Sequence, residues 1–164
     1  MLDNTLGGVN SNSYVTLIEA EDYFEDRMHS SAWTNVTDQE PFLISASRML
    51  DWYVKWKGSK TTSEQSMLWP RIGVVRSDGT VIDSNIIPSE VKIAVFELAF
   101  SNINNDRTLE DPLAGIGQIQ AGSLMIKAGA EKPNNTNAKL VPSHVLNIVS
   151  DLYNRGSVVR LVRG

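Results

Sequence analysis

The sequence of 164 residues contains no cysteine and only two histidines. The absence of cysteine excludes disulfide bonds, thiolate catalysis and cysteine-based zinc sites, and it fits a chain made in a reducing cytosol. His29 and His144 stand apart, and neither has a second histidine or a carboxylate at the spacing of a metal site. We therefore expect no metal and no cofactor, and we interpret both histidines as structural or solvent-exposed.

Long apolar runs and an excess of positive charge are also missing. No stretch is long enough to span a membrane, and the N-terminus lacks a secretory signal, so we expect no membrane partner. A formal net charge of −4 argues against extensive phosphate-backbone binding, which depends on Lys and Arg. The chain has no nucleophile-elbow serine and no glycine-rich phosphate loop, so we expect no catalytic residues and a protein that is not an enzyme.

The spacing of apolar residues predicts a mainly α-helical fold, a small bundle of about four helices with two short β-hairpin elements. Thr16 and Glu19 have the pattern of a capping box at the first helix, and Pro41 fits the first turn of the second. The third predicted helix is apolar around most of its circumference, which indicates a central helix or a contact between subunits. The helices are expected over about residues 17–28, 40–54, 89–100 and 142–155.

Two segments have the pattern of short β-hairpins. In residues 72–83, Asp78-Gly79 supplies the positive φ that a tight turn needs. Residues 115–130 alternate between apolar and other positions on both sides of Gly122. Both segments are therefore expected to be β-elements within the helical domain.

The folded domain is predicted over residues 14–155, between two segments of different composition. Residues 1–13 are rich in Gly, Asn and Ser and are expected to be a flexible lead-in. Residues 156–164 form an extended tail that suits strand addition to the sheet edge of a partner, and a disordered terminus is the alternative interpretation. The tail residues that would carry this docking are Val158, Val159, Arg160, Leu161, Val162 and Arg163.

A Trp-Pro-Arg motif precedes the first predicted hairpin. It leads through that hairpin into the apolar third helix, and this pattern is typical of packing and not of catalysis. We interpret the motif and its neighbours as a structural corner. Its residues are Gln65, Trp69, Pro70, Arg71 and Gly73.

Aromatic and basic residues are interleaved in residues 52–60. Surfaces that bind single-stranded nucleic acid combine rings that stack on bases, at about 1–3 kcal/mol per base, with cations that neutralise phosphates. The opposing interpretation is that the rings continue a core stripe and pack inward, which the negative net charge favours. The residues of the nucleic-acid alternative are Trp52, Lys55, Trp56, Lys57 and Lys60.

The order of these motifs resembles a known family over most of the chain, roughly from Ser13 to the C-terminus. The residues that carry the resemblance are Trp33, Trp56-Lys57-Gly58, Trp69-Pro70-Arg71 and the terminal Arg160-Leu161-Val162-Arg163-Gly164. They resemble the family described as DnaT-like single-stranded-DNA-binding proteins, encoded among the head genes of tailed bacteriophages. By architecture these proteins are similar to head-to-tail adaptors, also called connectors.

The resemblance implies a structural protein of the virion neck, made in the cytoplasm of the bacterial host. It implies a homo-oligomeric ring, typically of twelve copies, between the portal protein and the next tail component, a stopper or nozzle protein. Double-stranded DNA would pass through the lumen without sequence-specific binding. The resemblance also implies that residues 156–164 dock on the portal and that residues 115–130 contact a neighbouring subunit or the next ring.

Two functional hypotheses therefore follow from the sequence. The main one is the head-to-tail adaptor, and the alternative is a single-stranded nucleic-acid-binding module that uses residues 52–60. An affinity for single-stranded DNA that falls steeply with salt would favour the alternative.

Overall fold

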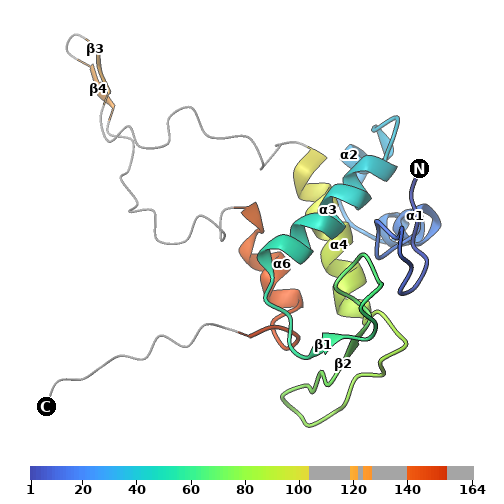
Figure 1. Cartoon of the computed structure of the whole chain (residues 1–164). Helices are drawn as coiled ribbons and strands as arrows, with labels where there is room; N and C mark the ends of the chain where they lie inside the picture. Colours follow the sequence, from blue (N-terminus) through green and yellow to red (C-terminus); the bar gives the residue numbers. More distant parts are fainter. Residues whose placement is uncertain (104–118, 122–123, 127–139, 155–164) are drawn as a thin grey trace, which may run out of the picture.

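The computed structural model describes residues 1–103, 119–121, 124–126 and 140–154. It confirms the predicted mainly α-helical fold with short antiparallel strand pairs (Figure 1). Within these residues, no helix combines the length and the apolar character needed to cross a membrane. The predicted tail over residues 156–164 lies outside the described residues, as does most of the β-element predicted over residues 115–130. The elements are α1 (Leu17–Glu25), α2 (Ser31–Thr34), α3 (Glu40–Tyr53), β1 (Ser59–Lys60), β2 (Arg71–Ile72), α4 (Ser89–Ile103), β3 (Ile119–Ala121), β4 (Leu124–Ile126) and α6 (Ser143–Ile148).

Helix α4 is the centre of the fold. Helices α3 and α6 pack against it, and α2 also contacts it (Figure 1). Because α4 is covered by elements of its own chain, it is a core helix, the first of the two predicted interpretations. Its buried residues are Val91, Ala94, Val95, Phe96, Leu98 and Ala99.

Helix α1 begins with the predicted capping box. The Thr16 hydroxyl accepts from the Glu19 N–H at 3.1 Å, and the Glu19 carboxylate accepts from the Thr16 N–H at 2.8 Å. On the buried face of α1, the Phe24 ring stacks on Trp33 of α2 with 4.3 Å between the ring centroids. The short helix α2 was not predicted, and its buried Trp33 ties the α1–α3 connection to the core.

Residues 1–13 lie against the body instead of forming the flexible lead-in that their composition predicts. The Leu2 N–H donates to the Glu40 carboxylate at 2.8 Å. Both the backbone N–H and the hydroxyl of Ser66 donate to the Gly8 carbonyl, each at 3.1 Å. The Asn and Ser residues of this segment act as hydrogen-bond partners of turns, which is why a composition typical of loops is ordered here.

The hairpin predicted over residues 72–83 is present, but its pairing is limited to a single bridge. Val75 and Val81 form an isolated antiparallel bridge, and Gly79 has the predicted positive φ, 89°. The strand β2 at its start pairs with β1 and not within the hairpin, a pairing that the sequence did not predict. In the second predicted β-element, β3 and β4 pair antiparallel.

The Trp-Pro-Arg motif lies inside the protein. Trp69 is 1% exposed and Gln65 is 2% exposed. The Gln65 side-chain amide donates to the carbonyls of Met67 at 2.9 Å and Pro70 at 3.0 Å, so it bridges both ends of the turn. Gly73 follows with φ 78°, which a residue with a Cβ adopts only with strain.

Arg71 is buried, and no carboxylate of the described residues lies within salt-bridge distance of it. Its guanidinium donates to the carbonyls of Lys57, Leu68 and Gly58 at 2.7, 3.0 and 2.6 Å. Burial lowers the pKa of Arg71 from its ordinary value, because a charged group loses solvation in the interior. The guanidinium thus connects the chain after α3 to the corner.

The last described residues pair with the chain that follows α3. Trp56 and Tyr153 form an antiparallel bridge. The Lys57 ammonium donates to the Asp151 carbonyl at 2.7 Å. These contacts hold the segment after α6 against the end of α3.

Candidate functional site

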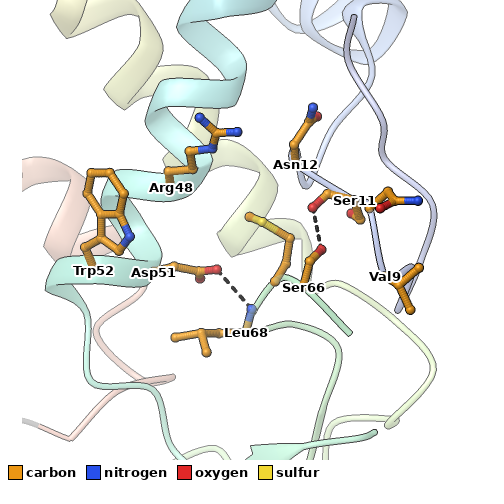
Figure 2. A pocket seen from close by; sticks show the side chains of 10 residues that line it. Val9, Ser11, Asn12, Arg48, Asp51, Trp52, Ser66 and Leu68 are labelled. Carbon is orange, nitrogen blue, oxygen red and sulfur yellow. Dashed lines mark hydrogen bonds between the residues drawn. The ribbon is translucent and has the colours of Figure 1, made fainter. Parts of the chain in front are cut away.

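A surface hollow of about 470 Å³ lies beside the C-terminal half of α3. Figure 2 shows α3 on one side of the hollow and the N-terminal segment on the other, with the loop that carries Ser66 and Leu68 between them. The Ser66 hydroxyl donates to the Ser11 carbonyl and thereby closes the wall opposite α3. The lining residues are Val9, Asn10, Ser11, Asn12, Arg48, Asp51, Trp52, Ser66, Met67 and Leu68.

Trp52 is the prominent aromatic residue of this hollow. It is 69% exposed, whereas Trp33, Trp56 and Trp69 are 1%, 5% and 1% exposed. An exposed indole ring leaves a large apolar surface in water. Burying that surface against a ligand would gain about 25 cal/mol of free energy for each Å² covered. A single exposed tryptophan at the edge of a hollow therefore provides a free face for a flat ligand.

Two basic side chains near Trp52 are free of partners within the described part of the chain. Arg48 and Lys55 are exposed, and neither forms an ion pair or a side-chain hydrogen bond with a described residue. Arg48 lies one turn before Trp52 on the same face of α3, and Lys55 follows the end of the helix. Six other described basic residues are engaged: Arg27, Lys57, Lys60, Arg71, Arg76 and Lys92.

The structure divides the residues that were predicted for nucleic-acid contact. Trp52 and Lys55 are exposed, as such a surface requires. Trp56 is buried and packs edge-on against another buried tryptophan at 5.7 Å, so its ring offers no face to a base. The ammonium groups of Lys57 and Lys60 donate to backbone carbonyls at 2.7 and 2.6 Å, and so they stabilise the fold.

The floor of the hollow is organised by Asp51. Its Oδ1 accepts from the Tyr14 hydroxyl and, at 3.4 Å, from the Trp56 indole N–H, and its Oδ2 accepts from the Leu68 N–H at 2.9 Å. Burial raises the pKa of Asp51 to about 6, because loss of solvation outweighs these hydrogen bonds. Burial and the nearby carboxylate also raise the pKa of Tyr14 well above its ordinary value. One carboxylate therefore joins α3, the N-terminal segment and the corner.

Arg48 and Asp51 are not among the site residues predicted from the sequence. A signal for Arg48 existed, because it lies one helical turn from Trp52. No local signal existed for Asp51, whose partners Leu68 and Tyr14 are 17 and 37 residues away. Among the described residues, no group of three or more His, Asp or Glu is arranged to hold a metal ion.

Comparison with known proteins gives a match over the whole chain. A family model described as "Putative DnaT-like ssDNA binding protein" matches residues 1–164. No curated protein and no solved structure matches the chain. The description of the family names the binding of single-stranded DNA, which corresponds to the alternative hypothesis from the sequence and not to the adaptor.

Proposed function

The chain belongs to the family of DnaT-like single-stranded-DNA-binding proteins, and from this premise we propose that it binds single-stranded DNA in the hollow beside Trp52. The observation that supports the proposal best is the exposed Trp52 ring, with the unengaged cations Arg48 and Lys55 before and after it. In this proposal the protein is a binding module and catalyses no reaction.

The proposed contact follows from the chemistry of a single strand. Unpaired bases expose both π-faces, and stacking on an aromatic side chain contributes about 1–3 kcal/mol per base. A base stacked on Trp52 would lie in the hollow, while its sugar-phosphate backbone would remain at the edge. Arg48 lines the hollow and Lys55 follows the end of α3; both are exposed and can neutralise phosphates because no described residue holds them.

The charge of the chain limits the electrostatic part of this binding. Each phosphate contact on a single strand contributes about −0.7 to the slope of log K against log salt concentration, so two cations predict a slope of about −1.4. A strongly basic binding surface would give a much steeper slope. The net charge of −4 therefore favours modest affinity that depends more on stacking than on salt.

Replacing the stacking residue tests the proposal directly. Fluorescence anisotropy of a labelled single-stranded oligonucleotide should show that Trp52→Ala weakens binding at least about fivefold, because one stacking contact is lost. The matched control is Ile18→Ala on α1, since Ile18 has the same exposed fraction, 69%, but does not line the hollow. Equal affinities of the wild type and Trp52→Ala would refute this binding site.

The cations can be tested by their effect on the salt dependence. Arg48→Gln should reduce the magnitude of the salt slope by about 0.7, as expected for one lost phosphate contact. Lys92→Gln removes the same charge from α4, where Lys92 pairs with Glu19 at 2.6 Å, and should leave the slope unchanged. Equal slopes for both variants would show that only net charge matters and that Arg48 makes no contact.

We also propose, as a second and independent function, that the protein is a head-to-tail adaptor in the neck of a phage virion, made in the host cytoplasm. It would form a ring, typically of twelve copies, between the portal and a stopper or nozzle protein, with double-stranded DNA in its lumen. Four exposed apolar residues within residues 72–86 support this proposal, because exposed apolar side chains suit contact between proteins. They are Ile72, Val75, Val81 and Ile86, which are 42–68% exposed.

The adaptor proposal has its own tests. Electron microscopy should show rings of the isolated protein or of its complex with portal, and the double variant Val75→Ser/Val81→Ser should reduce ring formation. Deleting residues 157–164 should leave a folded chain that no longer joins portal. Normal joining by the shortened chain would exclude the docking role of the tail, and the absence of rings under all these conditions would exclude the adaptor.

A further inference from the structure

We propose that Asp51 selects the base that enters the hollow, favouring bases with an exocyclic amino group (adenine, cytosine and guanine) over thymine and uracil. This inference rests on the proposed binding of single-stranded DNA beside Trp52. It assigns to Asp51 the role of a specificity-determining residue, whereas Trp52 stacks on any base.

The carboxylate of Asp51 has an acceptor position left. An ionised carboxylate can accept about four hydrogen bonds. Three donors from the described residues reach it, two at Oδ1 and one, the Leu68 N–H, at Oδ2. The remaining position is on Oδ2, and Asp51 lines the hollow beside Trp52 (Figure 2).

Two other polar side chains of the hollow, Asn12 and Ser66, are already engaged. The Asn12 amide accepts from the Asp3 N–H at 2.8 Å and donates to the Met1 carbonyl at 3.2 Å. The Ser66 hydroxyl donates to the carbonyls of the N-terminal segment. These groups hold the wall of the hollow, whereas the carboxylate of Asp51 lines it with an incompletely used acceptor that a base donor can meet.

The base edges differ in what they present to a carboxylate. Cytosine and adenine carry an amino group that donates hydrogen bonds, whereas thymine and uracil carry carbonyl oxygens at the corresponding position. The one remaining N–H of uracil lies between two carbonyl groups, whose negative ends are repelled by a carboxylate oxygen. A partly buried acceptor discriminates strongly between bases. A base without a donor at this position leaves the carboxylate oxygen unpaired or places a second acceptor against it.

The decisive measurement varies the nucleic acid and leaves the protein intact. Oligo(dC) and oligo(dU) of equal length differ at C4, an amino group against a carbonyl group, and at N3, an acceptor against an N–H, whereas their backbone charge is the same. We expect the wild-type protein to bind oligo(dC) about tenfold more tightly than oligo(dU) in fluorescence anisotropy. Equal affinities would overturn the role of Asp51 and leave the proposed DNA binding intact, whereas binding of neither strand would overturn both.

A variant then assigns the preference to the residue. Asp51→Asn replaces one carboxylate oxygen by an amino group and should reduce the ratio of the two affinities to nearly one. The matched control is Asp38→Asn, because Asp38 is exposed and does not line the hollow, and this variant should keep the tenfold ratio. An unchanged preference in a folded Asp51→Asn protein would overturn the assignment, and the comparison of strands remains decisive if that variant does not fold.

Discussion

Replacing Asp51 by asparagine should change how the stability of the protein depends on pH. Burial raises the pKa of this carboxyl from 3.8 to about 6, so the folded state binds its proton more tightly than the unfolded state. The resulting stabilisation is fully present below about pH 4 and is lost as the pH rises through about 6. Over that whole range the difference in pKa corresponds to about 3 kcal/mol, and roughly half of it is regained between about pH 8 and pH 5.

The assay is urea unfolding followed by tryptophan emission, at steps from about pH 8 to pH 5. Glu90 and Glu97 have lowered pKa values and act in the opposite direction, since their contribution is lost as the pH falls through their folded-state pKa. Both are present in the wild type and in the variant, so their effect cancels in the difference. We expect the stability of the wild type minus that of Asp51→Asn to grow by about 1.4 kcal/mol from pH 8 to pH 5.

The exposed Asp38→Asn serves as the control, and its difference from the wild type should not follow this pattern. Asp51→Asn leaves one acceptor oxygen for donors that reach both carboxylate oxygens, so one donor loses its partner, which lowers stability by an amount that does not vary with pH. The dependence on pH is therefore the diagnostic quantity. A difference that stays constant between about pH 5 and pH 8 would refute the raised pKa of the buried carboxyl.

Three further substitutions test the fold by the same unfolding assay. Gly58→Ala should destabilise by about 2 kcal/mol or more, because φ is 66° and the new Cβ would lie 2.3 Å from the Ile72 carbonyl oxygen; a neutral change would contradict this close approach. Trp69→Ala should cost about 3–5 kcal/mol through the cavity it leaves, and a cost below about 1 kcal/mol would mean that the ring is not buried. Thr16→Ala should cost about 1 kcal/mol by removing the helix cap, and an unchanged stability would show that the capping bond is weak.

Sequence patterns predicted those parts of the fold that depend on interactions between residues close in sequence. The capping box of Thr16 and Glu19, the positive φ of Gly79 and the apolar surface of α4 all depend on residues close in sequence, and all are found in the structure. The ordered N-terminal segment was not predicted. Its hydrogen bonds go to Glu40 and Ser66, and no pattern within residues 1–13 indicates such distant partners.

In the candidate site too, the features that depend on residues distant in sequence could not be predicted from local patterns. Trp52 and Trp56 are four residues apart and would share a face of a continuous helix, but α3 ends at Tyr53, and Val54 is extended with φ −102° and ψ 122°. This break in the helical spacing turns Trp56 into the core and leaves Trp52 outside. The hollow itself joins three segments distant in sequence, so Arg48 and Asp51 belong to one site with the N-terminal segment and the loop of Ser66 only in the folded chain.

The hydrogen-bond network of Asp51 has a consequence for the flexibility of the hollow. The Leu68 N–H is bound by this carboxylate, and the Trp69 N–H donates to the Tyr14 hydroxyl at 3.2 Å. Because these amides belong to the same network as the core, we expect their hydrogen exchange to require global unfolding and not a local opening. A ligand would therefore meet a floor that folding has already ordered, and its binding would lose little conformational entropy in the protein.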